Sequence, residues 1–112
     1  TFQELIVWQK SKEIILVLYP ISKTISEFSY RDQLNRALLS ISNNIAEGFG
    51  RNSNKEFKRF LNISLGSSYE VHSMLIIFKE LKILPFEISQ ALILKIEEII
   101  RLLVSLLTKI KI

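Results

Sequence analysis

Turn-forming residues are scarce in this chain, because three glycines and two prolines are spread over 112 residues. Glycine and proline are the strongest local breakers of helices and strands. A chain with so few of them is expected to form a small number of long elements, which disfavours the many short strands of a sandwich or barrel. At this length we expect one domain, residues 1–112, with one modest hydrophobic core.

Apolar residues recur at the three-, four- and seven-residue spacings of amphipathic helices in four segments. The expected helices are Phe2–Ser26, Ser29–Gly48, Ser53–Lys82 and a last one from Pro85 onward. Pro20 lies inside the first of these, and we expect a kink there, with a break at Tyr19 as the alternative. Four helices with short connections predict an all-α, antiparallel up-down four-helix bundle.

Helix-end signals set these boundaries. At three of the expected helix starts a Ser or Thr precedes an acidic residue by three positions, as in a capping box: Thr1 with Glu4, Ser29 with Asp32, and Ser53 with Glu56. Gly48 is expected to stop the second helix by adopting the left-handed conformation that costs glycine nothing. Pro85 suits the first position of the last helix.

The last helix carries more apolar residues than one buried face requires. Its first stripe is Ile88, Leu92, Ile96, Ile99, Leu103, Leu106 and Ile110, and its second is Ile93, Ile100, Val104 and Leu107. A helix of a monomeric four-helix bundle needs one apolar face about 100° wide. Extended exposed apolar surface usually marks an interface. We therefore expect the bundle to assemble into a homo-oligomer.

Several kinds of chemistry lack the residues they need. There is no cysteine, and His72 is the single histidine, with Glu70 on a different helix face, so no metal site is expected. Gly48-Phe49-Gly50 has neither the strand nor the Lys-Ser/Thr pair of a phosphate loop. The longest charge-free stretches have ten residues, too few to span a membrane. We predict that the protein is not an enzyme and needs no cofactor.

Basic residues are concentrated just after Gly48: Arg51, Lys55, Lys58 and Arg59. Lys55, Lys58 and Arg59 share a helix face near a helix N-terminus, where a phosphodiester backbone could bind without being read for sequence. The alternative interpretation is a solvated charged face with no nucleic-acid role. The net charge of +4 permits an anionic partner but falls well short of that of a histone.

Small and amide residues occupy the helical stretch Ser40–Gly48, where helix propensity would favour Leu or Lys. Small residues allow close helix approach, and Asn44 can bond to neighbouring backbone. Gly66-Ser67-Ser68 in the next helix has the same character. We expect these two small-residue segments to face each other.

These same stretches carry a resemblance to a known family. The matching pieces are Val7-Trp8-Gln9-Lys10, Gln33, Arg36-Ala37, Ser40-Ile41, Asn44-Ile45-Ala46-Glu47-Gly48, Arg51, Ser53, Phe57, Phe60-Leu61, Ser64, Gly66-Ser67 and Glu70. Together they resemble the four-helix bundle proteins encoded in intervening sequences of bacterial 23S rRNA genes. The residues matched to the family motif are Trp8, Asn44, Ala46, Glu47, Gly48 and Gly66.

The resemblance implies a bacterial cytoplasmic protein that forms a ring-like homopentamer. It also implies kinship with the accessory variability determinant of diversity-generating retroelements, a basic pentameric barrel thought to bind nucleic acid and a reverse transcriptase. With Arg36 added from the matching pieces, the candidate nucleic-acid-binding residues are Arg36, Arg51, Lys55, Lys58 and Arg59. The expected function is a scaffold that binds RNA or DNA, and the alternative is a scaffold for protein partners alone.

Overall fold

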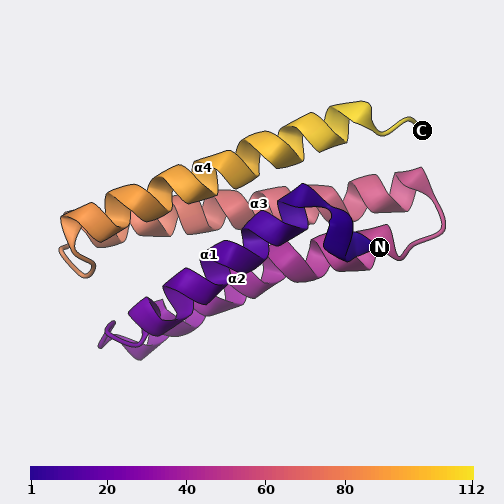
Figure 1. The fold of residues 1–112 in the computed structure, drawn as a ribbon. Helices are drawn as coiled ribbons and strands as arrows, with labels where there is room; N and C mark the ends of the chain where they lie inside the picture. The colour runs from indigo at the N-terminus through magenta and orange to yellow at the C-terminus, as the bar shows by residue number, and fades with distance from the viewer.

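Four long helices make up nearly the whole of the computed structural model, which describes residues 1–112. In chain order the elements are the 3-10 helix η1 (Phe2–Glu4), α1 (Ile6–Ser22), α2 (Phe28–Phe49), α3 (Asn54–Glu80) and α4 (Phe86–Lys109). They form an antiparallel up-down bundle with extents of 44 × 22 × 20 Å (Figure 1). The expected all-α four-helix bundle is confirmed. None of the helices is both long enough and apolar enough to cross a membrane.

Neighbouring helices pack closely in the cyclic order α1, α2, α3, α4, and no Cα atoms of a diagonal pair lie within 8 Å of each other. The α2–α3 pair is the most extensive of the four, followed by α3–α4. The α2–α3 connection and both ends of the chain lie at one end of the bundle, and the other two connections lie at the opposite end (Figure 1). Segments that are far apart in sequence therefore meet at each end.

A single hydrophobic core runs along the bundle axis, and every helix contributes one stripe to it. Its largest fully buried side chains are Ile14, Leu18, Ile25, Leu34, Leu38, Ile41, Ile45, Leu61, Leu75, Leu84, Leu92 and Ile96. Burying one such side chain stabilises the fold by roughly 1.5–3 kcal/mol. The periodicity of the sequence therefore predicted the core-facing side of α2 and most of that of α4. It was wrong for α1, where Leu16 and Tyr19 were expected in the buried stripe but are exposed, and Val7, Ile14 and Leu18 face the core instead.

The first helix is shorter than expected at both ends. Leu5 adopts an extended conformation (φ −71°, ψ 124°), which separates η1 from α1. At the other end α1 continues through Pro20 to Ser22, so no break occurs at Tyr19. Proline removes one intrahelical donor, here the one that would reach the carbonyl of Leu16. Leu16 is an exposed residue, so water can replace that donor.

The expected ends of the second helix are wrong. The helix begins at Phe28 with Glu27 as its N-cap, so Ser29 lies inside it and caps nothing. At the other end α2 runs through Gly48 to Phe49, and no glycine has a positive φ. The residue with left-handed geometry is Lys82 (φ 59°), just after α3. Gly48 is therefore required for a reason other than helix termination.

The other capping predictions fare better. The Ser53 hydroxyl accepts a hydrogen bond from the Glu56 amide at 3.1 Å, which confirms the start of the third helix. That helix ends at Glu80, two residues earlier than expected. Pro85 is the N-cap of α4 and not its first helical residue. The predicted elements are thus correct, and the errors are confined to their ends.

The second apolar stripe of α4 is only partly surplus. Ile93 and Leu107 belong to the core, Ile100 is half-buried, and Val104 is 42% exposed. The core also takes in part of the second stripe because α4 packs against both α3 and α1. Exposed apolar residues occur elsewhere instead, on all four helices.

Candidate functional site

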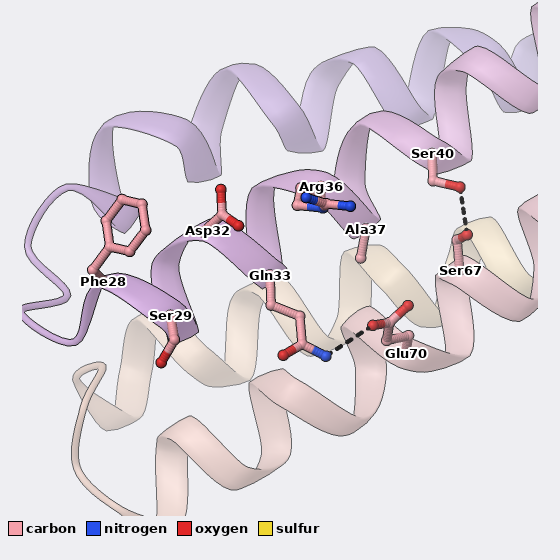
Figure 2. Close-up of a pocket in the computed structure, with 9 residues that line it drawn as sticks. All are labelled: Phe28, Ser29, Asp32, Gln33, Arg36, Ala37, Ser40, Ser67 and Glu70. Atoms are coloured by element: carbon pink, nitrogen blue, oxygen red, sulfur yellow. Dashed lines mark hydrogen bonds between the residues drawn. The ribbon is translucent and has the colours of Figure 1, made fainter.

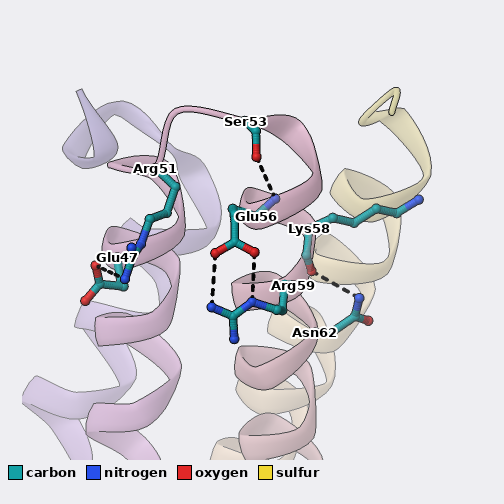
Figure 3. Close-up of polar contacts among 7 residues, drawn as sticks. All are labelled: Glu47, Arg51, Ser53, Glu56, Lys58, Arg59 and Asn62. Atoms are coloured by element: carbon teal, nitrogen blue, oxygen red, sulfur yellow. Dashed lines mark hydrogen bonds and ion pairs between the residues drawn. The ribbon is translucent and has the colours of Figure 1, made fainter.

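The four clustered basic candidates lie at the corner where α2 passes into α3. Arg51 belongs to the connection, and Lys55, Lys58 and Arg59 belong to the first two turns of α3. Figure 3 shows Arg51, Lys58 and Arg59. Lys58 is half-buried and the other three are exposed. The N-cap at Ser53 fixes where α3 begins, and so fixes the direction in which these side chains leave the helix.

Both arginines of this corner are engaged with neighbouring carboxylates. An ion pair of 3.2 Å joins Arg51 to Glu47. Arg59 donates two hydrogen bonds to Glu56, from Nε at 3.0 Å and from Nη2 at 3.1 Å. Both guanidinium groups also lie over the ring of Phe60, at 4.9 Å and 4.4 Å from its centroid. Arg51 therefore links the end of α2 to the start of α3, whereas the contacts of Arg59 lie within α3.

This pairing changes the titration of Glu56. The hydrogen bond from Arg59 holds the pKa of the Glu56 carboxyl below its usual 4.5, with smaller contributions from the charges of Arg59, Arg51 and Lys55. The same hydrogen bond raises the pKa of Arg59. Both groups are exposed, so solvent screens the pair and limits its contribution to stability.

The two lysines of the corner are free. No carboxylate lies within 4.0 Å of Lys55 or Lys58, in contrast to the two arginines. The nearby Asn62 amide donates to the Lys58 carbonyl at 3.0 Å, so it is used within the helix (Figure 3). The positive charge available to an anionic partner at this corner is therefore mainly that of the lysines.

Arg36 lies elsewhere, in a groove between α2 and α3 with a volume of about 590 Å³. Two hydrogen bonds cross the groove: Gln33 to Glu70 at 3.2 Å, and Ser40 with Ser67 at 2.7 Å (Figure 2). Arg36 is exposed, and it precedes Arg51 by 15 residues along α2, roughly 22 Å at 1.5 Å per residue. The structure therefore does not bring Arg36 together with the other four basic candidates.

The small-residue segments of α2 and α3 face each other, as expected. Ser40 bonds with Ser67, and the buried Ser64 hydroxyl donates to the Ile41 carbonyl at 2.7 Å. At Gly48 a β-carbon would lie 2.7 Å from Cβ of Phe60. Glycine is thus required there by the close approach of the two helices. Gly66, in contrast, is exposed, with no atom within 4 Å of a β-carbon placed on it.

The remaining motif residues have structural contacts. Asn44 donates to the Ser40 carbonyl at 2.7 Å and also lies 3.0 Å from the Ser40 hydroxyl. Trp8 packs against the core and meets Phe2 edge-to-face at 5.1 Å. Glu47 pairs with Arg51, and Ala46 is half-buried. The contacts of Asn44 and Glu47 are local to α2 and the residues just after it, those of Trp8 are with Phe2 and the core, and none forms a reactive arrangement.

His72 faces α4, where its Nε2 lies 3.3 Å from the Glu97 carboxylate but has no hydrogen-bond partner of suitable geometry. Sequence reasoning did not find this pair, because Glu97 is 25 residues away along the chain. No group of three or more His, Asp or Glu residues is placed to hold a metal ion.

The fold and the α2–α3 contacts define a small four-helix bundle in which α2 and α3 pack closely at Gly48 and through Ser40, Ser64 and Ser67. The family model for 23S rRNA-intervening sequence proteins matches residues 3–105, so the chain belongs to that family. A crystal structure of a protein of unknown function from the S23 ribosomal protein family of Bacteroides thetaiotaomicron is similar, with a TM-score of 0.87 and 26% identity. The similarity covers 91% of this chain and 98% of that one. No curated protein matches the chain.

Proposed function

We propose that this chain is a non-enzymatic scaffold that assembles into a ring-like homo-oligomer and presents a basic surface to RNA or DNA. The observation that carries the assembly is the number of large apolar side chains left exposed in a single copy, 18 in all, including Phe28, Leu16 and Leu94 at 69%, 64% and 66% exposure. Extended apolar surface of this kind usually marks an interface. The number of subunits, five, and the cytoplasmic location rest on the family resemblance alone.

The assembly is tested by light scattering at micromolar concentration. A pentamer has a mass of about 65 kDa, five times the 13.0 kDa of one chain. A monomer at that concentration would contradict the proposal of assembly. A tetramer or hexamer would leave the scaffold standing and correct the subunit number.

The surface proposed for assembly is the outer side of α4 with the adjoining side of α3. Leu94 and Val104 of α4 are 66% and 42% exposed, and Tyr69 and Ile76 of α3 are also exposed. The Lys79–Gln90 hydrogen bond and the His72–Glu97 contact set the register between the two helices. In that register Tyr69 lies opposite Ile100, and Ile76 lies opposite Ile93, so apolar residues flank the His72–Glu97 pair on both sides.

The nucleic-acid role is supported by the α2–α3 corner. Lys55 and Lys58 are unpaired, whereas each arginine already has a carboxylate partner. Binding to phosphates through such charges weakens steeply with salt. We expect Lys55→Gln with Lys58→Gln to weaken binding of a labelled duplex more than Arg51→Gln with Arg59→Gln does. An equal loss of affinity in both variants would show that pairing with Glu47 and Glu56 does not prevent the arginines from binding phosphates.

The second candidate function is a scaffold for protein partners alone. A reverse transcriptase is one partner that the protein could assist under either proposal. The exposed apolar residues at the end opposite the basic corner favour it, among them Leu81 and Phe86 at 57% and 64% exposure. Affinity capture before and after nuclease treatment separates the two functions. A partner that survives nuclease favours the protein scaffold, and one that is lost favours nucleic acid.

A further inference from the structure

The segment that follows α4 is held against the start of α3. The Asn54 side-chain amide donates a hydrogen bond to the backbone carbonyl of Lys111 at 2.8 Å. Asn54 is the first residue of α3, directly beside the basic corner. This contact, across 57 positions of sequence, brings Lys109 and Lys111 to the end of the bundle that carries Lys55 and Lys58.

The lysines of the two segments lie at the same end of the bundle, with Lys109 on the side of α4 that borders α1. The side chain of Lys58 extends from α3 toward the side on which α4 lies (Figure 3). Lys109 closes α4, and both it and Lys111 are exposed. None of the four lysines has a carboxylate within 4.0 Å, although six ion pairs occur elsewhere in the chain. Four free ammonium groups from two segments therefore share this end.

We infer that Lys55, Lys58, Lys109 and Lys111 form one polybasic surface for the phosphodiester backbone of a nucleic acid. The inference rests on the proposed nucleic-acid function and adds two residues to it. Lysine acts as a compact point charge, whereas arginine is suited to bidentate recognition. Because the two arginines here are paired with Glu47 and Glu56, the surface offers positive charge but no free bidentate donor that could recognise a base. Binding is accordingly independent of base sequence.

The arrangement depends on the position of Lys111 and not only on its charge. Without the Asn54 hydrogen bond the segment after α4 has no polar side-chain anchor to α3. Its lysine would then be ordered only when a ligand binds, and that ordering lowers the affinity. Asn54→Ala keeps every charge of the surface, so it separates placement from charge count.

The test measures duplex binding over a range of salt concentrations by fluorescence anisotropy, with a labelled DNA of about 20 base pairs. The variants are Lys109→Gln with Lys111→Gln, and Lys55→Gln with Lys58→Gln. A matched control is Lys23→Gln with Lys82→Gln, which removes the same charge at the opposite end of the bundle. Log affinity falls as log salt rises, and each lysine that contacts a phosphate adds about 0.9 to the magnitude of this slope. Both test pairs are therefore expected to lower that magnitude by about 0.9 for each lysine involved.

The outcomes distinguish this inference from the function on which it rests. If only Lys55→Gln with Lys58→Gln lowers the slope, the inference is overturned and the nucleic-acid function stands. If the unaltered protein binds no duplex, or polyglutamate competes as well as unlabelled duplex, both are overturned. If the control pair lowers the magnitude of the slope as much as the test pairs do, binding depends only on the net charge of the protein, and the inference is overturned. Weaker binding by Asn54→Ala supports it.

Discussion

Gly48 of α2 and Phe60 of α3 lie so close that a β-carbon on the glycine would come within 2.7 Å of the β-carbon of the phenylalanine. The Phe60 ring is in turn covered by Arg51 and Arg59, each paired with a carboxylate. The closest helix contact and the basic corner are therefore parts of one arrangement. A change at the glycine is expected to disturb both.

Replacement of Gly48 by alanine is expected to destabilise the protein by about 1–3 kcal/mol. The added methyl group overpacks the α2–α3 contact, where Phe60 and the Phe57 backbone cannot easily move away. The better helix propensity of alanine offsets only about 1 kcal/mol of this. Urea unfolding at a fixed protein concentration measures the change.

Gly66→Ala is the matched control for that experiment. Gly66 also lies inside a helix, but it has open space around it, so alanine should stabilise by about 0.5–1 kcal/mol. If both substitutions stabilise, the close approach at Gly48 is not a constraint on the fold.

Ser53→Ala is expected to cost about 1 kcal/mol of stability, because it removes the acceptor for the Glu56 amide at the start of α3. Ser29→Ala is the comparison, since Ser29 lies inside α2 and is exposed. Its replacement should change the unfolding free energy by less than about 0.5 kcal/mol. A large loss at Ser29 would restore the capping role predicted from sequence.

Arg59→Gln is expected to raise the pKa of Glu56 toward 4.5, because the hydrogen bond from Arg59 is the main cause of its lowered value. Since the folded-state pKa is depressed, the pair stabilises the fold above a pH of about 4.5, and this contribution is lost as the pH falls through the lower folded value. Titration of the carboxyl carbon by nuclear magnetic resonance measures the shift. Lys58→Gln, which leaves the hydrogen bond intact, should leave the midpoint near that of the unaltered protein.

Leu94→Glu with Val104→Glu is expected to reduce the oligomer to monomers without loss of helix content. Both side chains are exposed in one copy, so the charges are tolerated there but not in an apolar interface. Light scattering gives the mass, and circular dichroism gives the helix content. Leu16→Glu on α1 is the control, with 64% exposure on another helix. Should Leu16→Glu dissociate the oligomer while the double variant does not, the interface lies on α1.

Periodicity and composition were sufficient to predict four helices, the core-facing sides of α2 and α4, and the α2–α3 contact of small residues. These properties are local or repeat along one helix, and Leu34, Leu38 and Ile96 are buried as their spacing required. The core-facing side of α1 was predicted wrongly, since Leu16 and Tyr19 are exposed and Ile14 and Leu18 are buried. Helix ends were predicted less well. The chemical signal at Ser53 was sufficient, whereas the similar signal at Ser29 was not, because the helix already begins with Glu27 as its N-cap, two residues earlier.

The candidate site likewise has features that the sequence predicts and features that only the tertiary structure shows. The sequence by itself determined that basic residues gather near the start of α3, since Lys55, Lys58 and Arg59 are neighbours along one helix. The ion pairs that engage the two arginines are local as well, at i,i+4 for Glu47 with Arg51 and i,i+3 for Glu56 with Arg59. Only the tertiary structure decided that the Arg51 guanidinium lies over the ring of Phe60. It also decided that Gly48 serves close packing and not helix termination, and that Lys111 lies beside Asn54. Contacts between distant segments follow from how helices pack, and no local pattern in the chain records them.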